Sequence, residues 1–82
     1  MEIVTAVKPL PAYVLQVEFN TGHVKRFDLT PYLSKGIFAR LRDESLFKQA
    51  YVAYDTVCWP GNLDISPATL FDRGTTISAQ AA

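Results

Sequence analysis

The chain has 82 residues, with eight basic and eight acidic side chains, so its formal net charge is zero. This length suits one small domain, and the hydrophobic fraction of 49% is enough for one core. The neutral balance argues against tight binding to nucleic acid by charge alone. A single cysteine excludes an intramolecular disulfide and, with no apolar run long enough for a signal peptide or a membrane span, favours a cytoplasmic protein.

Residues 1–29 are predicted to form three strands. The segment 13–19, "YVLQVEF", alternates apolar and polar residues, which is typical of an antiparallel strand buried on one face. The preceding strand is expected to stop at Pro9-Leu10-Pro11, and "NTGH" supplies a hairpin loop. In the return strand "VKRFDL" the spacing of Val24 and Phe27 predicts a bulge.

Residues 30–50 are predicted to form a broken pair of helices. Thr30 and Pro31 match an N-cap followed by proline at the first helical position, and Gly36 is expected to end that helix. Asp43 then caps a second apolar stripe in "ESLFKQA".

Residues 51–73 return to strand and end in a helix, with "YVAY" and "TVCW" forming a tight hairpin around Asp55. The stretch "TVCWPGNLDIS" gathers the only tryptophan and the only cysteine, yet most of its residues have a structural role. Proline and glycine follow Trp59 in the order of a type II turn, and Ser66 precedes a proline as an N-cap. The structural residues singled out in this loop are Trp59, Pro60, Gly61, Asp64 and Ser66. We expect Trp59 in the core, against residues 44–50, with its indole N–H bonded to backbone.

The chain offers little that indicates catalysis. A nucleophilic pair would have to be Cys58 with His23, and a lone cysteine within a strand is usually a small buried hydrophobe. Asp28 and Asp64 both precede helix starts, so local capping is favoured over an acid–base pair. One Cys and one His are too few for a zinc site. We therefore expect no enzyme activity, no metal and no cofactor.

Basic residues offer a different reading, in which the chain is an accessory to nucleic-acid binding. The candidates are Lys25, Arg26, Arg40 and Arg42. Basic groups on one hairpin strand are more often a solvated face, and no helix-turn-helix is visible.

The order of these signals resembles the DUF 2442 family, bacterial domains of unknown function. The matching positions are Val7, Pro9, Leu15, Val17, Phe19, Gly22, Phe27 to Leu29, Pro31 to Leu33, Phe38, Leu41, Phe47, Trp59-Pro60, Leu63 to Ile65 and Leu70. Phe71 departs from the pattern, because the family often has tyrosine there. The resemblance implies a small α+β domain, found alone or ahead of a helix-turn-helix domain, often in arrangements that look like toxin–antitoxin pairs. It implies no catalytic residues.

Together these observations predict one α+β domain over residues 1–73 and a frayed tail over residues 74–82. The expected fold is a mainly antiparallel sheet of about five strands, in the order β-β-β-α-β-β-α, with short helices on one face.

The expected function is a non-enzymatic interaction module that self-associates or binds a small protein partner, as in a toxin–antitoxin-like or regulatory complex. The alternatives are the nucleic-acid role and, third, a small enzyme of unknown type. "TVCW" lacks charge up to Asp64, so an unprotected strand edge or the outer sheet face is expected to be covered, with Tyr13, Val14 and Tyr54 as contacts.

Overall fold

Two antiparallel sheets and several short helical segments make up the computed structural model, which describes residues 1–79 and side chains up to residue 77. The four-stranded sheet has the order β1 (Val4–Leu10), β2 (Val14–Phe19), β3 (His23–Asp28) and β7 (Thr75–Ala79). The three-stranded sheet has the order β4 (Tyr51–Ala53), β5 (Thr56–Trp59) and β6 (Leu63–Ile65). The helical segments are η1 (Pro11–Tyr13), η2 (Thr30–Tyr32), η3 (Gly36–Arg42), α1 (Glu44–Phe47) and α2 (Pro67–Arg73). The fold is therefore a mixed α+β fold with antiparallel sheets, as predicted, but the strands form two sheets instead of one.

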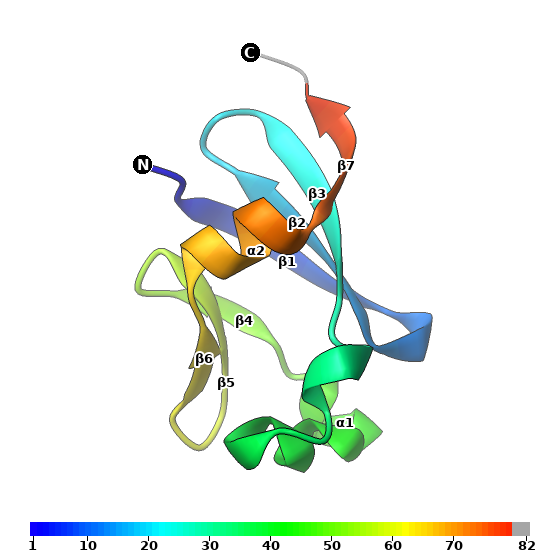
Figure 1. Ribbon diagram of the computed structural model, residues 1–82. Coiled ribbons are helices and arrows are strands. Elements are labelled where there is room, and N and C mark those ends of the chain that lie inside the picture. Colours follow the sequence, from blue (N-terminus) through cyan, green and yellow to red (C-terminus); the bar gives the residue numbers. More distant parts are fainter. Residues whose placement is uncertain (80–82) are drawn as a thin grey trace.

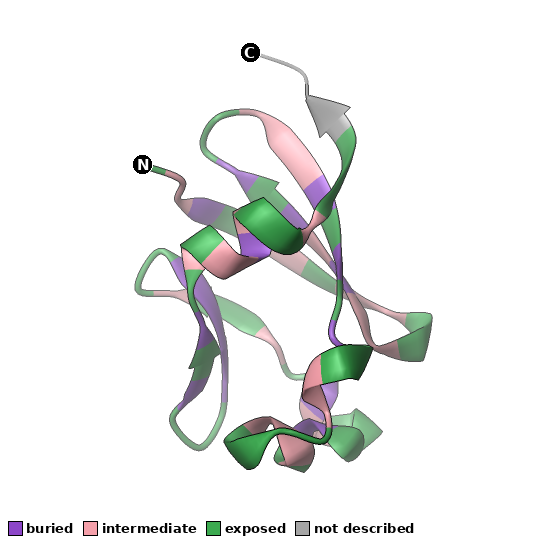
Figure 2. Ribbon diagram, in the orientation of Figure 1, coloured by how far each residue is buried: buried purple, intermediate pink, exposed green. Residues whose placement is uncertain are grey.

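The two sheets meet where β1 lies beside β4, and the N–H of Val4 donates to the carbonyl of Asp55 at 2.9 Å. Helix α2 runs across one side of the space between the sheets, and the segments η3 and α1 lie at its lower end (Figure 1). The buried cluster draws on both sheets and on the helical segments: Val4, Leu15, Val17, Phe19, Phe27, Leu29, Leu41, Phe47, Val57, Trp59, Leu63, Ile65 and Leu70. Figure 2 shows buried residues in strands of both sheets and in the helical segments. One core thus holds the whole fold together.

The predicted alternation in β2 is confirmed, since Leu15, Val17 and Phe19 are buried and Glu18 is exposed. The predicted bulge is wrong for the β2–β3 pair, whose register is unbroken from Glu18 opposite Val24 onward. In the pairing of β3 with β7 the register does shift, between Val24 and Lys25, within the segment where the bulge was predicted.

Lys25 explains why the β3 pattern was misread. It occupies an inward position and is buried, and its Nζ donates to the carbonyl of Phe71 while lying 3.8 Å from the centre of that ring. The aliphatic stem of a lysine packs like an apolar side chain, so β3 alternates regularly in its pairing with β2. Lys25 joins β3 to α2.

The first strand ends at Leu10, within the Pro9-Leu10-Pro11 stretch where the sequence predicts its end. Pro9 itself lies within β1 opposite Leu15, and β1 is an edge strand. A proline is tolerated at an edge because a residue whose N–H faces away from the ladder needs no partner.

The start of the helical region differs from the prediction. Thr30 lies inside the 3-10 helix η2 and makes no side-chain cap, while the Oδ1 of Asp28 accepts the N–H of Thr30 at 3.0 Å. Gly36 begins η3 with a φ of +50° and does not end a helix. The predicted cap at Asp43 is confirmed, because its Oδ1 accepts the N–H of Ser45 at 3.0 Å.

The predicted turn and cap after β5 are confirmed. Gly61 has a φ of +93°, as the third position of a type II turn requires, and the turn leads into β6. The Oγ of Ser66 accepts the N–H of Thr69 at 3.1 Å. Strand β6 itself was missed, since three residues between a turn and a cap carry too short a pattern to be recognised.

Part of the tail expected to fray is a strand. Residues 75–79 form β7 and pair with β3, whereas residues 80–82 lie outside the described residues. Gly74 lets the chain turn from α2 into β7, because a Cβ at this position would lie 2.5 Å from the carbonyl oxygen of Leu70. Residues 75–79 have no apolar periodicity of their own, so their strand depends on the pairing with β3.

The strand "TVCW" is also not an edge. As β5 it is the middle strand, between β4 and β6, and all four of its residues are buried. The hairpin around Asp55 is confirmed, with positive φ at Tyr54 and Asp55.

Replacing Trp59 with Ala should destabilise the fold by about 3–5 kcal/mol, because it empties a core site and leaves a carbonyl unpaired. Trp59 is 1% exposed and its Nε1 donates to the carbonyl of Phe47 at 3.0 Å. Trp59→Phe keeps most of the ring volume and should cost less. Urea unfolding followed by circular dichroism measures both. An unchanged midpoint for Trp59→Ala would contradict this role.

Replacing Ser66 with Ala should cost about 1 kcal/mol of unfolding free energy, because the first turn of α2 loses its side-chain acceptor. Ser34→Ala is the matched control: Ser34 is exposed, so its removal should change stability by less than about 0.5 kcal/mol. Thermal unfolding of the two variants side by side checks this. Equal losses would mean that the Ser66 hydroxyl does not stabilise the helix.

Candidate functional site

The three predicted partner contacts do not form one surface. Tyr54 is 89% exposed in the turn between β4 and β5. Tyr13 is half-buried: its hydroxyl donates to the carbonyl of Arg42 at 2.5 Å and its ring lies edge-on to Phe47. Val14 lies on the four-stranded sheet between Leu10 and Asp28. Of the three, only Tyr54 presents most of its side chain to solvent.

The four basic candidates are also dispersed. Lys25 is buried under α2, and the Nε of Arg26 donates to Gln16 at 3.4 Å on the outer face of the sheet. Arg40 donates to the carbonyl of Gly61 and Arg42 to the carbonyl of Leu33. These two arginines attach loops to η3. The four basic side chains therefore do not form one surface for binding nucleic acid.

The residues considered for catalysis lie apart in the fold. Cys58 is in the middle of the three-stranded sheet, while His23 begins β3 and its Nδ1 lies 2.7 Å from the Oγ1 of Thr21. Asp28 and Asp64 are exposed on different sheets. Across the described residues, no group of three His, Cys, Asp or Glu side chains is placed to hold a metal ion.

Cys58 lies beneath a shallow hollow on the outer face of the three-stranded sheet. Tyr51 and Asp64 flank it on the neighbouring strands, and with Tyr54 they border a space of about 270 Å³. Burial raises the pKa of the Cys58 thiol above its usual value of 9.0, and the nearby carboxylate of Asp64 raises it further. The side chain is therefore a neutral thiol at neutral pH, which is the opposite of an activated nucleophile.

The outer face of the four-stranded sheet is polar where it was expected to need a cover. Lys8, Gln16 and Arg26 stand opposite one another across β1, β2 and β3. Such a row is stable in water without a partner.

The edge at β7 was missed by sequence reasoning. Thr75, Thr76 and Ile77 are exposed, and Ile77 is 46% exposed. Strand β7 pairs only with β3 and lies at the outer side of the sheet (Figure 1). The signal in the sequence was the β-branched run "TTI", in a segment without charge or proline from residue 74 to residue 82.

Asp64→Asn should lower the pKa of Cys58, since it removes one of the two causes that raise it. The rate of alkylation by iodoacetamide should then begin to rise at a lower pH than in the unaltered protein. Asp72→Asn, an exposed carboxylate on α2, is the control and should leave the profile in place. A profile that stays fixed or moves to higher pH in Asp64→Asn would refute the placement of this charge.

Comparison with known proteins gives one match. No curated protein and no solved structure matches the chain. Separately, no helix among residues 1–79 is long and apolar enough to cross a membrane. The model of the family described as "Protein of unknown function (DUF2442)" matches residues 4–76. That match runs from the first strand to the second residue of β7, so the chain belongs to the DUF2442 family.

Proposed function

We propose that this protein is a non-enzymatic interaction module that associates through the edge of β7. The observation that carries the proposal is the lack of charge and proline along this edge. An edge strand presents unpaired N–H and C=O groups that can pair with another strand. Residues 74–82 contain neither charge nor proline, two of the devices that natural proteins use against such pairing.

The opposite edge of the same sheet supports this interpretation by contrast. Strand β1 carries Lys8 and Pro9, and Val4 at its start is bonded to the turn at Asp55. These features discourage a further strand at β1. The two edges of one sheet thus differ in chemistry, and β7 is the one suited to adding a strand.

The proposed occupant is a second copy of this chain, with the two β7 strands antiparallel across a twofold axis. A closed twofold dimer places each strand opposite its own copy, so a charged strand would oppose like charges. Strand β7 carries no charge, and the chain as a whole is neutral. Ile77 supplies exposed apolar surface at the strand that would pair.

Ile77→Lys should convert the dimer to monomer, because a charge on each β7 would oppose its copy across the twofold axis. Sedimentation velocity at micromolar concentration gives the mass of each species. Ile37→Lys is the matched control, since Ile37 is 56% exposed on η3 and the same chemical change there should leave the dimer intact. Circular dichroism should show that both variants remain folded.

A monomer at all concentrations would overturn the second copy as occupant, as would a dimer that survives Ile77→Lys. Dimer loss in both variants would point to unspecific apolar contact. A pull-down from native cells tests whether the partner at β7 is a different protein. If the unaltered chain captures a small protein and Ile77→Lys does not, the complex is a heteromer of the toxin–antitoxin-like kind and the homodimer is wrong.

A further inference from the structure

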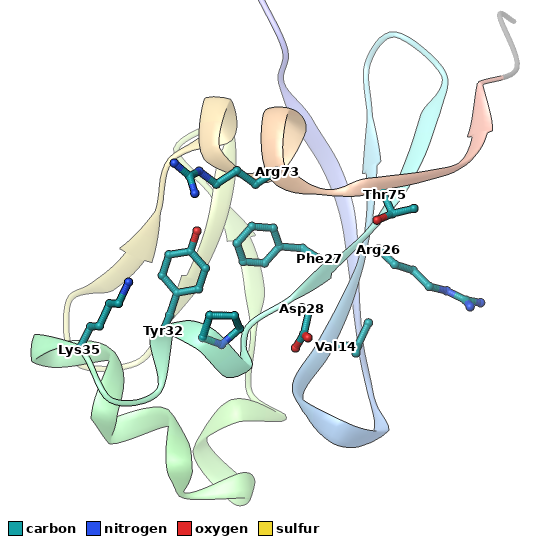
Figure 3. Close-up of a pocket in the computed structure, with 9 residues that line it drawn as sticks. Val14, Arg26, Phe27, Asp28, Tyr32, Lys35, Arg73 and Thr75 are labelled. Carbon is teal, nitrogen blue, oxygen red and sulfur yellow. The ribbon is translucent and has the colours of Figure 1, made fainter.

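A second feature is a hollow on the described part of the molecule. It has a volume of about 480 Å³ and lies where the end of β3, the 3-10 helix η2, the end of α2 and the start of β7 come together. The polar side chains that line it are Arg26, Asp28, Tyr32, Lys35, Arg73 and Thr75 (Figure 3). A hollow of this size suits a small organic molecule.

Tyr32, Lys35 and Arg73 line this hollow together. In Figure 3 the Tyr32 hydroxyl points toward the guanidinium of Arg73, whereas Arg26 points away. Arg73 and Lys35 are exposed, and among residues 1–77, whose side chains are described, no hydrogen bond or ion pair engages their head groups. Lys25, Arg40 and Arg42, by contrast, all donate to backbone carbonyls.

Tyr32 is held in place by the core. Its ring is tilted against Phe27 with 5.4 Å between the ring centres, and edge-on to Phe38 at 6.0 Å. The Nζ of Lys35 lies 5.6 Å from the centre of the Tyr32 ring. The aromatic packing therefore fixes the direction of the Tyr32 hydroxyl before any ligand arrives, which lowers the ordering cost of binding.

The local charge is positive although the chain is neutral. Asp28 is the one carboxylate at the hollow, and its Oδ1 already accepts the N–H of Thr30. An arginine fork binds two oxygens of a phosphate at once, and a lysine adds a compact point charge. A phosphate group, with about −1.5 to −2 charge at neutral pH, matches two cations better than a carboxylate does.

We propose that this hollow binds the phosphate group of a small organic phosphate, through Arg73, Lys35 and the Tyr32 hydroxyl. The side chains of Val14 and Pro31 line the same hollow and offer apolar contact to the organic part. The proposal does not depend on the β7 dimer, because none of the three phosphate-binding residues lies on β7.

Amide chemical shifts in a titration with phenyl phosphate, at constant ionic strength, test this site. We expect saturable shifts at Lys35, Arg73 and Thr75, and weaker binding of inorganic phosphate, which lacks the organic part. Arg73→Gln and Lys35→Gln should each weaken binding about tenfold, the effect of one charge-assisted hydrogen bond. Lys48→Gln, an exposed lysine that does not line the hollow, should bind as the unaltered protein does.

Tyr32→Phe removes only the hydroxyl and should weaken binding while the fold stays intact. The proposal is overturned if phenyl phosphate gives no saturable shift, if acetate gives the same shifts at the same concentration, or if Lys48→Gln loses as much affinity as Arg73→Gln. If inorganic phosphate binds as tightly as phenyl phosphate, the claim that the site recognises the organic part of the ligand is wrong. Ile77→Lys should bind phenyl phosphate normally, so failure of the dimer and failure of this site are told apart.

Discussion

The packing of Trp59 between the three-stranded sheet and α1 is the interaction on which the rest of the structure depends. Its ring is buried and its indole N–H donates to the carbonyl of Phe47, so the large side chain enters the core without leaving a polar group unpaired. Helix α1 has four residues, too few to be stable alone. The segment between β3 and β4 contains only such short pieces, and their order comes from packing against Trp59 and its neighbours.

A second contact positions both surfaces to which we assign a function. Lys25 reaches from β3 to the carbonyl and ring of Phe71, and Gly74 allows the chain to leave α2 close to Leu70 and Lys25. The seat of α2 on β3 determines where Arg73 lies and where β7 joins the sheet. The packing of α2 on β3 therefore positions both the hollow and the β7 edge. Different residues would bind the phosphate and form the dimer.

The family match leaves the function open, so the physical argument has to come from surfaces. The sequence offered Tyr13 and several basic side chains as contacts for a partner. In the structure, Tyr13, Lys25, Arg40 and Arg42 donate hydrogen bonds to backbone carbonyls of this chain. Such bonds satisfy carbonyl groups that irregular segments leave without a partner. The uncharged β7 edge and the polar groups around Tyr32 are the two surfaces on which the proposals rest. Neither could be told from the residue types alone, because the same types serve structure elsewhere in the chain.

The sequence by itself determined the features that depend on neighbours in the chain: the alternation of β2, the turn after Trp59, the caps at Asp43 and Ser66, and the family pattern. These follow from steric preferences and hydrogen bonds over a few residues. The tertiary structure alone decided that β5 is a middle strand, that Lys25 is buried and that residues 75–79 pair with β3. Strand pairing and burial join residues far apart in the chain, so no local pattern encodes them.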